Sequence, residues 1–140
     1  KQYAEEGDLS TLISEHSGGE DNNTMTIVTG STNVGTSNTV TFDILVTPTT
    51  TRISFVSKIS PSPDWFVGVS SFDLVNGNEL VESASVRLYP LDAGSDSGTS
   101  YESPDSPEPG PISQIQGTPF SSGSIESTQI GTLSVERIDN

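Results

Sequence analysis

Short runs in which apolar and polar residues alternate are the feature that most restricts what this chain can fold into. The clearest run is residues 38–46, where apolar side chains stand at every second position: Val40, Phe42, Ile44 and Val46. Alternation with a period of two indicates a strand that buries one face. Turn-forming residues separate this run from further predicted strands at residues 24–28, 52–59, 65–72, 83–89, 112–116 and 130–138. This spacing favours an antiparallel sandwich.

Length and composition agree with a single thin domain. The 140 residues are 30% hydrophobic, and a chain of this length buries roughly two-thirds of the surface that its unfolded form exposes. A helix is predicted over residues 8–15 with Asp8 as its cap. Its apolar residues fall on one face: Leu9, Leu12 and Ile13. We therefore expect one all-β domain over residues 1–140, an antiparallel β-sandwich with long polar loops and one short N-terminal helix.

The net charge of −14, from 19 acidic and five basic residues, excludes several classes of function. Phosphate contacts need clusters of Lys and Arg, so nucleic-acid binding is not expected. Cations and cationic partners are favoured instead. The chain has no cysteine, which excludes disulfides and thiolate metal sites. No apolar run approaches the roughly 20 residues of a membrane span, so membrane insertion is not expected either.

Three aspartates form a candidate site for a hard divalent cation. Asp64 directly precedes the only tryptophan, whereas Asp92 and Asp96 lie four residues apart in a glycine-rich turn. That turn opens a long segment without periodicity, residues 92–111, which predicts a long loop. Calcium takes six to eight oxygen ligands at about 2.3–2.6 Å, and three carboxylates crowded together without a cation repel one another. Asp-Gly turns are also common in solvated loops, so the spacing alone leaves both interpretations open.

The glycine-rich turn is not an EF-hand loop. Counted from Asp92, the sixth position is Ser97 rather than Gly, and the twelfth is Ser103 rather than Glu.

Catalysis is not expected from the residues available. His16 is the only histidine, and nothing around it resembles the surroundings of a catalytic nucleophile. A glycosidase pair made by Asp64 with Asp92 or Asp96 would need a cleft lined with sugar-stacking aromatic residues. Trp65 is expected to anchor packing rather than to hold a ligand.

Three other polar positions have minor candidate roles. Asn22-Asn23-Thr24 is an acceptor sequence for N-glycosylation. Glu102 fits either an exposed position or one that orients a metal ligand, and Asp73 is expected to point away from the candidate site.

The same segments carry a resemblance to a known family. Three motifs follow one another along the chain: SPSPDWFVGV at residues 60–69, LYPLDAGSDSG at residues 88–98 and YESP at residues 101–104. Together they resemble the spondin amino-terminal domain of F-spondin and mindin, which also occurs in bacterial exported proteins. The segment AEEGD at residues 4–8 is similar to an interior part of that family, and the closing strand through Val135 and Ile138 is similar to its end.

The resemblance implies an antiparallel β-sandwich of secreted adhesion or matrix proteins that holds one calcium ion, Ca²⁺. The family's ligands are the aspartate before the tryptophan and the two aspartates of the glycine-rich turn, which match Asp64, Asp92 and Asp96. Family domains usually carry a further amino-terminal portion, which we expect to be absent here and to leave an open sheet edge. Val75 stands where animal members often carry cysteine, which argues against their disulfide pattern and against the integrin and lipopolysaccharide binding described for them.

The function expected from these observations is a secreted or cell-surface, calcium-binding adhesion or matrix module without enzymatic activity. Its partner is expected to be an extracellular protein or a glycan. One alternative is a structural subunit of an extracellular filament or envelope, a homo-oligomer in which a neighbouring chain supplies a strand. The other alternative is a calcium-dependent glycan binder.

Overall fold

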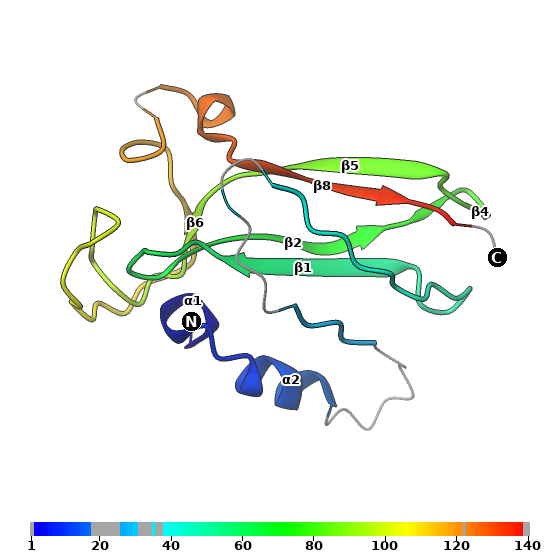
Figure 1. Cartoon of the computed structure of the whole chain (residues 1–140), viewed down its shortest axis with the longest axis horizontal. Coiled ribbons are helices and arrows are strands. Elements are labelled where there is room, and N and C mark those ends of the chain that lie inside the picture. Colours follow the sequence, from blue (N-terminus) through cyan, green and yellow to red (C-terminus); the bar gives the residue numbers. More distant parts are fainter. Residues whose placement is uncertain (1, 18–25, 31–34, 36–37, 122, 139–140) are drawn as a thin grey trace.

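The protein is an assembly of short antiparallel sheets with two helices at its N-terminal end, as the computed structural model in Figure 1 shows. The structure describes residues 2–17, 26–30, 35, 38–121 and 123–138. Its elements, in chain order, are α1 (Gln2–Glu6), α2 (Ser10–Ser17), β1 (Arg52–Lys58), β2 (Trp65–Asp73), β3 (Val75–Asn76), β4 (Glu79–Leu80), β5 (Ser83–Leu88), β6 (Leu91–Asp92), β7 (Ser113–Gln114), the 3₁₀ helix η1 (Ile125–Thr128) and β8 (Gly131–Glu136).

Every strand pair in the described part of the chain is antiparallel, so the predicted all-β class is confirmed. One sheet has the strand order β1-β2-β6-β7, and the pairs β3-β4 and β5-β8 form two further sheets. Strand β5 contacts β2, and in the view of Figure 1 the β5-β8 pair lies on one side of β1-β2 and the two helices on the other.

The core is small and centres on β2. Its buried apolar side chains come from five segments of the chain: Ala4, Trp65, Val67, Leu74, Leu88 and Ala93. Trp65 is packed edge-on against Tyr101 and Phe120, with ring centroids 5.5 and 5.3 Å away. These ring contacts bring the loop after β6 and the segment before η1 onto the same end of the sheet.

Two helices replace the single one predicted from the sequence. Asp8 does accept hydrogen bonds at the start of α2, from the Ser10 backbone N–H at 2.8 Å and the Ser10 hydroxyl at 2.9 Å. The predicted apolar face of this helix is not buried, since Leu12 and Ile13 are 38% and 36% exposed. The unpredicted helix α1 owes its position to Ala4, whose side chain is buried beside β1 and β2.

The prediction of a strand over residues 38–46, where the alternation is most regular, is wrong. Among the described residues this segment belongs to no sheet, and the nearest pairing is the isolated bridge between Thr47 and Thr50, beyond its end. Alternation specifies which face a strand would bury, but a strand also needs a partner backbone. The predicted strand at residues 24–28 is likewise absent over 26–28, and Thr24 and Met25 lie outside the described residues.

The other predicted strands are present with shifted ends. The strands over residues 52–59, 65–72 and 83–89 correspond to β1, β2 and β5, and the last two predictions correspond to β7 and β8. In β8, Leu133 and Val135 are more buried than Thr132 and Ser134, as the alternation predicted. The turn at Gly77 lies between β3 and β4, with a positive φ of 68°.

Candidate metal centre

Asp64 ends the turn between β1 and β2 and is fixed there by the residues before it. The Trp65 backbone N–H donates to the Ser62 hydroxyl at 3.2 Å, and that hydroxyl donates to the Ile59 carbonyl. The Ile59 N–H in turn donates to the Trp65 carbonyl at 2.9 Å, which closes the turn. Asp64 is thereby held inside the protein, with 0% of its surface exposed.

The two carboxylate oxygens of Asp64 have different surroundings. Oδ2 accepts three hydrogen bonds, from the Ser95 N–H at 2.7 Å, the Ser95 hydroxyl at 3.1 Å and the Asp96 N–H at 3.1 Å. Oδ1 is buried and accepts no hydrogen bond from the described residues. A buried carboxylate oxygen without a partner costs free energy, and a cation bound to Oδ1 would remove that cost.

Asp92 reaches the same end of the molecule through strand pairing. It lies on β6, directly opposite Trp65 of β2. Its Oδ1 accepts a hydrogen bond from the Gly94 N–H at 2.7 Å. Burial raises the pKa of the Asp92 carboxyl above its ordinary value, and the negative charges of Asp64 and Asp96 raise it further against the opposing effect of the Gly94 hydrogen bond.

Asp96 holds the base of the long loop together. Its side chain is 6% exposed. Oδ1 accepts from the Gly98 N–H at 2.6 Å, and Oδ2 accepts from the Ser106 N–H at 2.7 Å. The Ser106 hydrogen bond, aided by that from Gly98, lowers the pKa of Asp96. Asp96 also forms an isolated bridge with Pro107, so the loop is closed at its base by both backbone and side chain.

The two glycines of the turn are needed for its shape. Gly94 has φ of +66°, and a Cβ there would lie 2.4 Å from the Pro111 carbonyl oxygen. A Cβ on Gly98 would lie 2.5 Å from Cγ of Pro63 and 2.8 Å from Oδ1 of Asp96. All three distances are far below ordinary contact, so the turn can adopt this shape only because both residues lack a side chain.

The structure brings the three aspartates to one end of the sheet but does not arrange them as a finished ligand set. Asp64 and Asp96 are linked by a hydrogen bond, and the charges of both act on Asp92. Even so, among the described residues no group of three or more His, Cys, Asp or Glu side chains is placed so that it could hold a metal ion. A cation at Asp64 would therefore have to draw the other two carboxylates towards it.

The donor chemistry fits calcium rather than a soft metal. The possible ligand atoms are the carboxylate oxygens of Asp64 and the Ser95 hydroxyl beside them, and oxygen ligands are those that Ca²⁺ prefers. The bare Oδ1 of Asp64 gives such an ion a first contact. Asp64 with Asp92 and Asp96 would hold it, and the ion would add positive charge beside these three carboxylates.

Other candidates from the sequence fall elsewhere. Trp65 is 2% exposed and packs in the core, as expected. Glu102 is exposed, and Asp73 forms an ion pair with Arg52 at 3.6 Å. The side chain of His16 and the acceptor sequence that begins at Asn22 lie outside the described residues.

Sequence reasoning missed Ser95 and Ser106, whose backbone N–H groups bind the aspartates. Backbone donors carry no residue-type signal, so only the glycines on either side could have indicated them.

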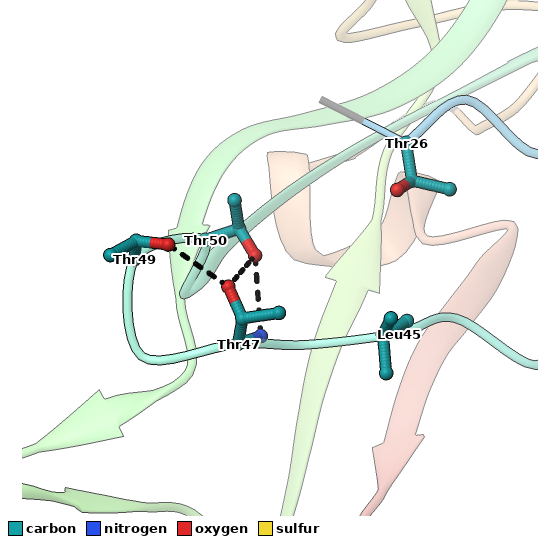
Figure 2. Close-up of a pocket in the computed structure, with 5 residues that line it drawn as sticks. All are labelled: Thr26, Leu45, Thr47, Thr49 and Thr50. Carbon is teal, nitrogen blue, oxygen red and sulfur yellow. Dashed lines mark hydrogen bonds between the residues drawn. The ribbon is translucent and has the colours of Figure 1, made fainter. Parts of the chain in front are cut away.

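A hollow lies near the other end of β1, away from the candidate metal centre. Figure 2 shows its lining residues, and its volume is about 260 Å³. Four of the five are threonines: Thr26, Thr47, Thr49 and Thr50, with Leu45. The Thr47 hydroxyl bonds to those of Thr49 and Thr50, at 3.1 and 2.6 Å. These hydroxyls satisfy one another, and the hollow contains no charged group.

An antiparallel all-β domain with an acidic, glycine-rich loop at one end of its sheet is the class that fold and site define. The chain matches the spondin N-terminal family model, Spondin_N, over residues 1–124. It belongs to this family.

Its relatives include Spondin-2 from Homo sapiens, 58% identical over 52 residues that cover 37% of this chain and 16% of that protein. Spondin-1 from Rattus norvegicus is 38% identical over 100 residues, covering 61% of this chain and 12% of that protein. The chain thus spans less than a fifth of the length of these curated relatives. Within the described ranges, no helix has the length and apolarity needed to cross a membrane.

Proposed function

We propose that this chain is a calcium-binding, non-enzymatic module of an extracellular adhesion or matrix protein, in which the ion fixes the loop end of the domain. Membership of the spondin family supports the extracellular adhesion role. The unpartnered Oδ1 of Asp64 is the observation that carries the metal proposal. Asp64, Asp92 and Asp96 are the proposed ligands, and water or loop carbonyls complete the shell.

Burial of the site supports a structural ion. Asp64 is completely buried and Asp96 nearly so, which leaves little room for a ligand that must approach from solvent. Burial, together with the negative charges of Asp64 and Asp96, raises the pKa of Asp92. An ion bound here would offset the cost of the charged carboxylate and stabilise the folded state by mass action. A calcium-dependent glycan binder would instead need open coordination positions, and the burial of Asp64 disfavours it.

Thermal unfolding with and without calcium tests the proposal. Dialysis against a chelator is expected to lower Tm, and added calcium is expected to restore it. At a free concentration about 100 times Kd, a site of this kind stabilises the folded state by about 2.7 kcal/mol. Magnesium at the same concentration is the control, because it demands a tighter octahedral shell. Identical melting curves in chelator and in calcium would rule out a structural ion.

A filament or envelope subunit is the second candidate function, and one observation favours it. Residues 38–46 have the pattern of a strand, yet Phe42, Ile44 and Leu45 are 47%, 43% and 76% exposed. Such a segment could pair with a strand of a neighbouring chain. Sedimentation should then show a concentration-dependent ordered oligomer, and a monodisperse monomer at high concentration would contradict this candidate.

A further inference from the structure

Lys58 lies between the short helix α1 and the candidate metal centre. It is the last residue of β1 and pairs with Phe66 of β2, and the next backbone pair, Ile59 with Trp65, leads directly to Asp64. Its ammonium donates to the carbonyl of Glu5 at 2.8 Å and also to that of Ala4. One cation therefore closes the C-terminal end of α1, where helix carbonyls lack partners and positive charge is favoured.

Backbone and side chain of Lys58 both hold this helix. The Lys58 N–H donates to the Tyr3 hydroxyl at 3.1 Å, and Cδ of the Lys58 side chain would lie 4.0 Å from a Cβ on Gly7. Ala4, on the same helix, is 3% exposed. The docking of α1 thus depends on where the Lys58 side chain lies.

The same ammonium is subject to the negative charges of Asp64 and Glu5. Burial lowers the pKa of Lys58, while the charges of Asp64 and Glu5 act in the opposite direction and favour its charged form. Asp64 and the Lys58 ammonium therefore attract each other, so that Lys58 acts as a counter-charge for Asp64. Within the described residues the other cation of this strand, Arg52, lies at the far end and pairs with Asp73.

We infer that Lys58 couples cation binding at Asp64 to the docking of α1. This inference rests on the proposed calcium site. A divalent ion at Asp64 takes over the role of counter-charge and repels the ammonium, so the anchor of α1 weakens when the ion binds. Linkage makes the effect reciprocal: the charge of Lys58 weakens calcium binding by the factor with which calcium weakens the anchor.

Calorimetric titration of calcium into the wild type, Lys58→Met and Arg52→Met tests this coupling at one ionic strength. Met keeps an apolar stem of similar length, and Arg52→Met removes the same unit of charge from the same strand. Lys58→Met is expected to bind calcium more tightly, on the order of fivefold, while Arg52→Met keeps the wild-type affinity. Lys58→Arg, which retains the charge, should also stay close to the wild type.

Failure of the proposed function and failure of this inference alone would give different results. A wild type that binds no calcium overturns the proposed function and this inference with it. A wild type that binds calcium, with Lys58→Met no tighter or with Arg52→Met equally improved, overturns the inference alone.

Hydrogen exchange on the wild type gives a second measurement that needs no variant. The Gly7 N–H donates to the Tyr3 carbonyl at 2.9 Å across the end of α1. Its exchange is expected to become faster when calcium is added, whereas the amides of β2 slow or stay unchanged. Unchanged or increased protection of Gly7 in calcium would overturn the coupling even if Lys58→Met failed to fold.

Discussion

At the scale of single residues, the two carboxylate oxygens of Asp64 differ in their hydrogen bonding. Oδ2 accepts hydrogen bonds from Ser95 and Asp96, whereas Oδ1 accepts none from the part of the chain that the structure describes. The hydrogen-bonded oxygen fixes the orientation of the group, so the other oxygen is presented in one direction. A ligand atom that is already oriented loses little entropy when an ion binds.

Replacing Asp64 by Asn is therefore expected to abolish the rise in Tm that calcium produces. The amide keeps the shape of the side chain but removes the charge that an ion needs. Asp73→Asn is the matched control: it removes an equal charge and an exposed ion pair worth about 0–1 kcal/mol. Differential scanning calorimetry of both variants should show the calcium response retained in Asp73→Asn, and a retained response in Asp64→Asn would contradict the ligand assignment.

Asp92 makes a prediction about pH. Its pKa in the folded protein lies above the ordinary value, so the folded state holds the proton more tightly than the unfolded state. Its contribution to stability is therefore greatest below the ordinary pKa and is lost as pH rises through the raised one. Without calcium, Asp92→Asn is expected to have a higher Tm than the wild type at neutral pH, and the difference should shrink on acidification. A lower Tm for this variant at neutral pH would show that its charge is not penalised.

The pKa of Asp96 is shifted in the opposite direction from that of Asp92. Its hydrogen bonds lower its pKa, so its contribution to stability is present above the ordinary pKa and is lost as pH falls through the lowered one. The acid limb of a plot of Tm against pH should therefore flatten in Asp96→Asn, measured without calcium.

Gly94 and Gly77 allow conformational strain to be separated from steric overlap. Both have positive φ, but a Cβ on Gly77 meets nothing within 4 Å, whereas one on Gly94 meets the Pro111 carbonyl at 2.4 Å. Gly77→Ala is expected to cost about 1 kcal/mol from backbone strain alone. Gly94→Ala should cost clearly more, by denaturant unfolding, because the loop must also move. Equal losses in the free energy of unfolding for the two variants would mean that the loop can move at no energetic cost.

At the scale of elements, the long loop after β6 is closed by short pairings rather than by long strands. Strand β7 pairs with β6 at its base, and Asp96 with Pro107 forms a second closure further along. Beyond these closures, Tyr101 packs edge-on against Trp65. The loop is thus tied to the sheet at several points although it has little regular structure.

Residues 38–46 provide a prediction for an element that lacks a sheet. No ladder of the described structure includes them. Apart from the Asn38 N–H, which donates to the Gly35 carbonyl, their amides are therefore expected to exchange close to the rate of an unstructured peptide, while those of β1 and β2 are protected. Hydrogen exchange read out by mass spectrometry measures both in one experiment. Protection of 38–46 comparable to that of β2 in dilute monomer would contradict the extended, unpaired state.

The sequence predicts strands well where strand and partner are neighbours in the chain. The β1-β2 hairpin and the β3-β4 turn at Gly77 follow from local signals. The strand predicted over residues 38–46 is absent because strand pairing depends on two segments, whereas the alternation pattern describes only one of them. Asp64, Asp92 and Asp96 could be selected from residue type and glycine spacing. The asymmetry of the Asp64 oxygens could not, because it depends on backbone donors 31 and 32 residues away.

At the scale of the whole molecule, the net negative charge destabilises the folded state. A net charge of −14 on 140 residues makes the folded chain repel itself, and burial of few apolar side chains leaves little to offset this repulsion. The domain is therefore expected to respond to ionic conditions as a whole, beyond any single site.

Sodium chloride is accordingly expected to raise Tm in the presence of chelator. Increasing it from about 0.01 M to about 0.15 M shortens the screening length from roughly 30 to 8 Å. The effect should weaken near pH 4, where carboxylates lose charge. Potassium chloride should act equally, whereas calcium acts at far lower concentration if the site is specific. A Tm that falls with salt at neutral pH would show that the ion pairs outweigh the repulsion.

The single indole of the chain directly follows Asp64 and is buried with it. A luminescent lanthanide such as terbium, in the place proposed for calcium, would therefore sit within energy-transfer range of Trp65. Ultraviolet excitation of Trp65 in the native protein would then sensitise luminescence of the bound ion without any added label. The domain carries its own antenna, and green emission that calcium displaces would give a direct optical measure of occupancy.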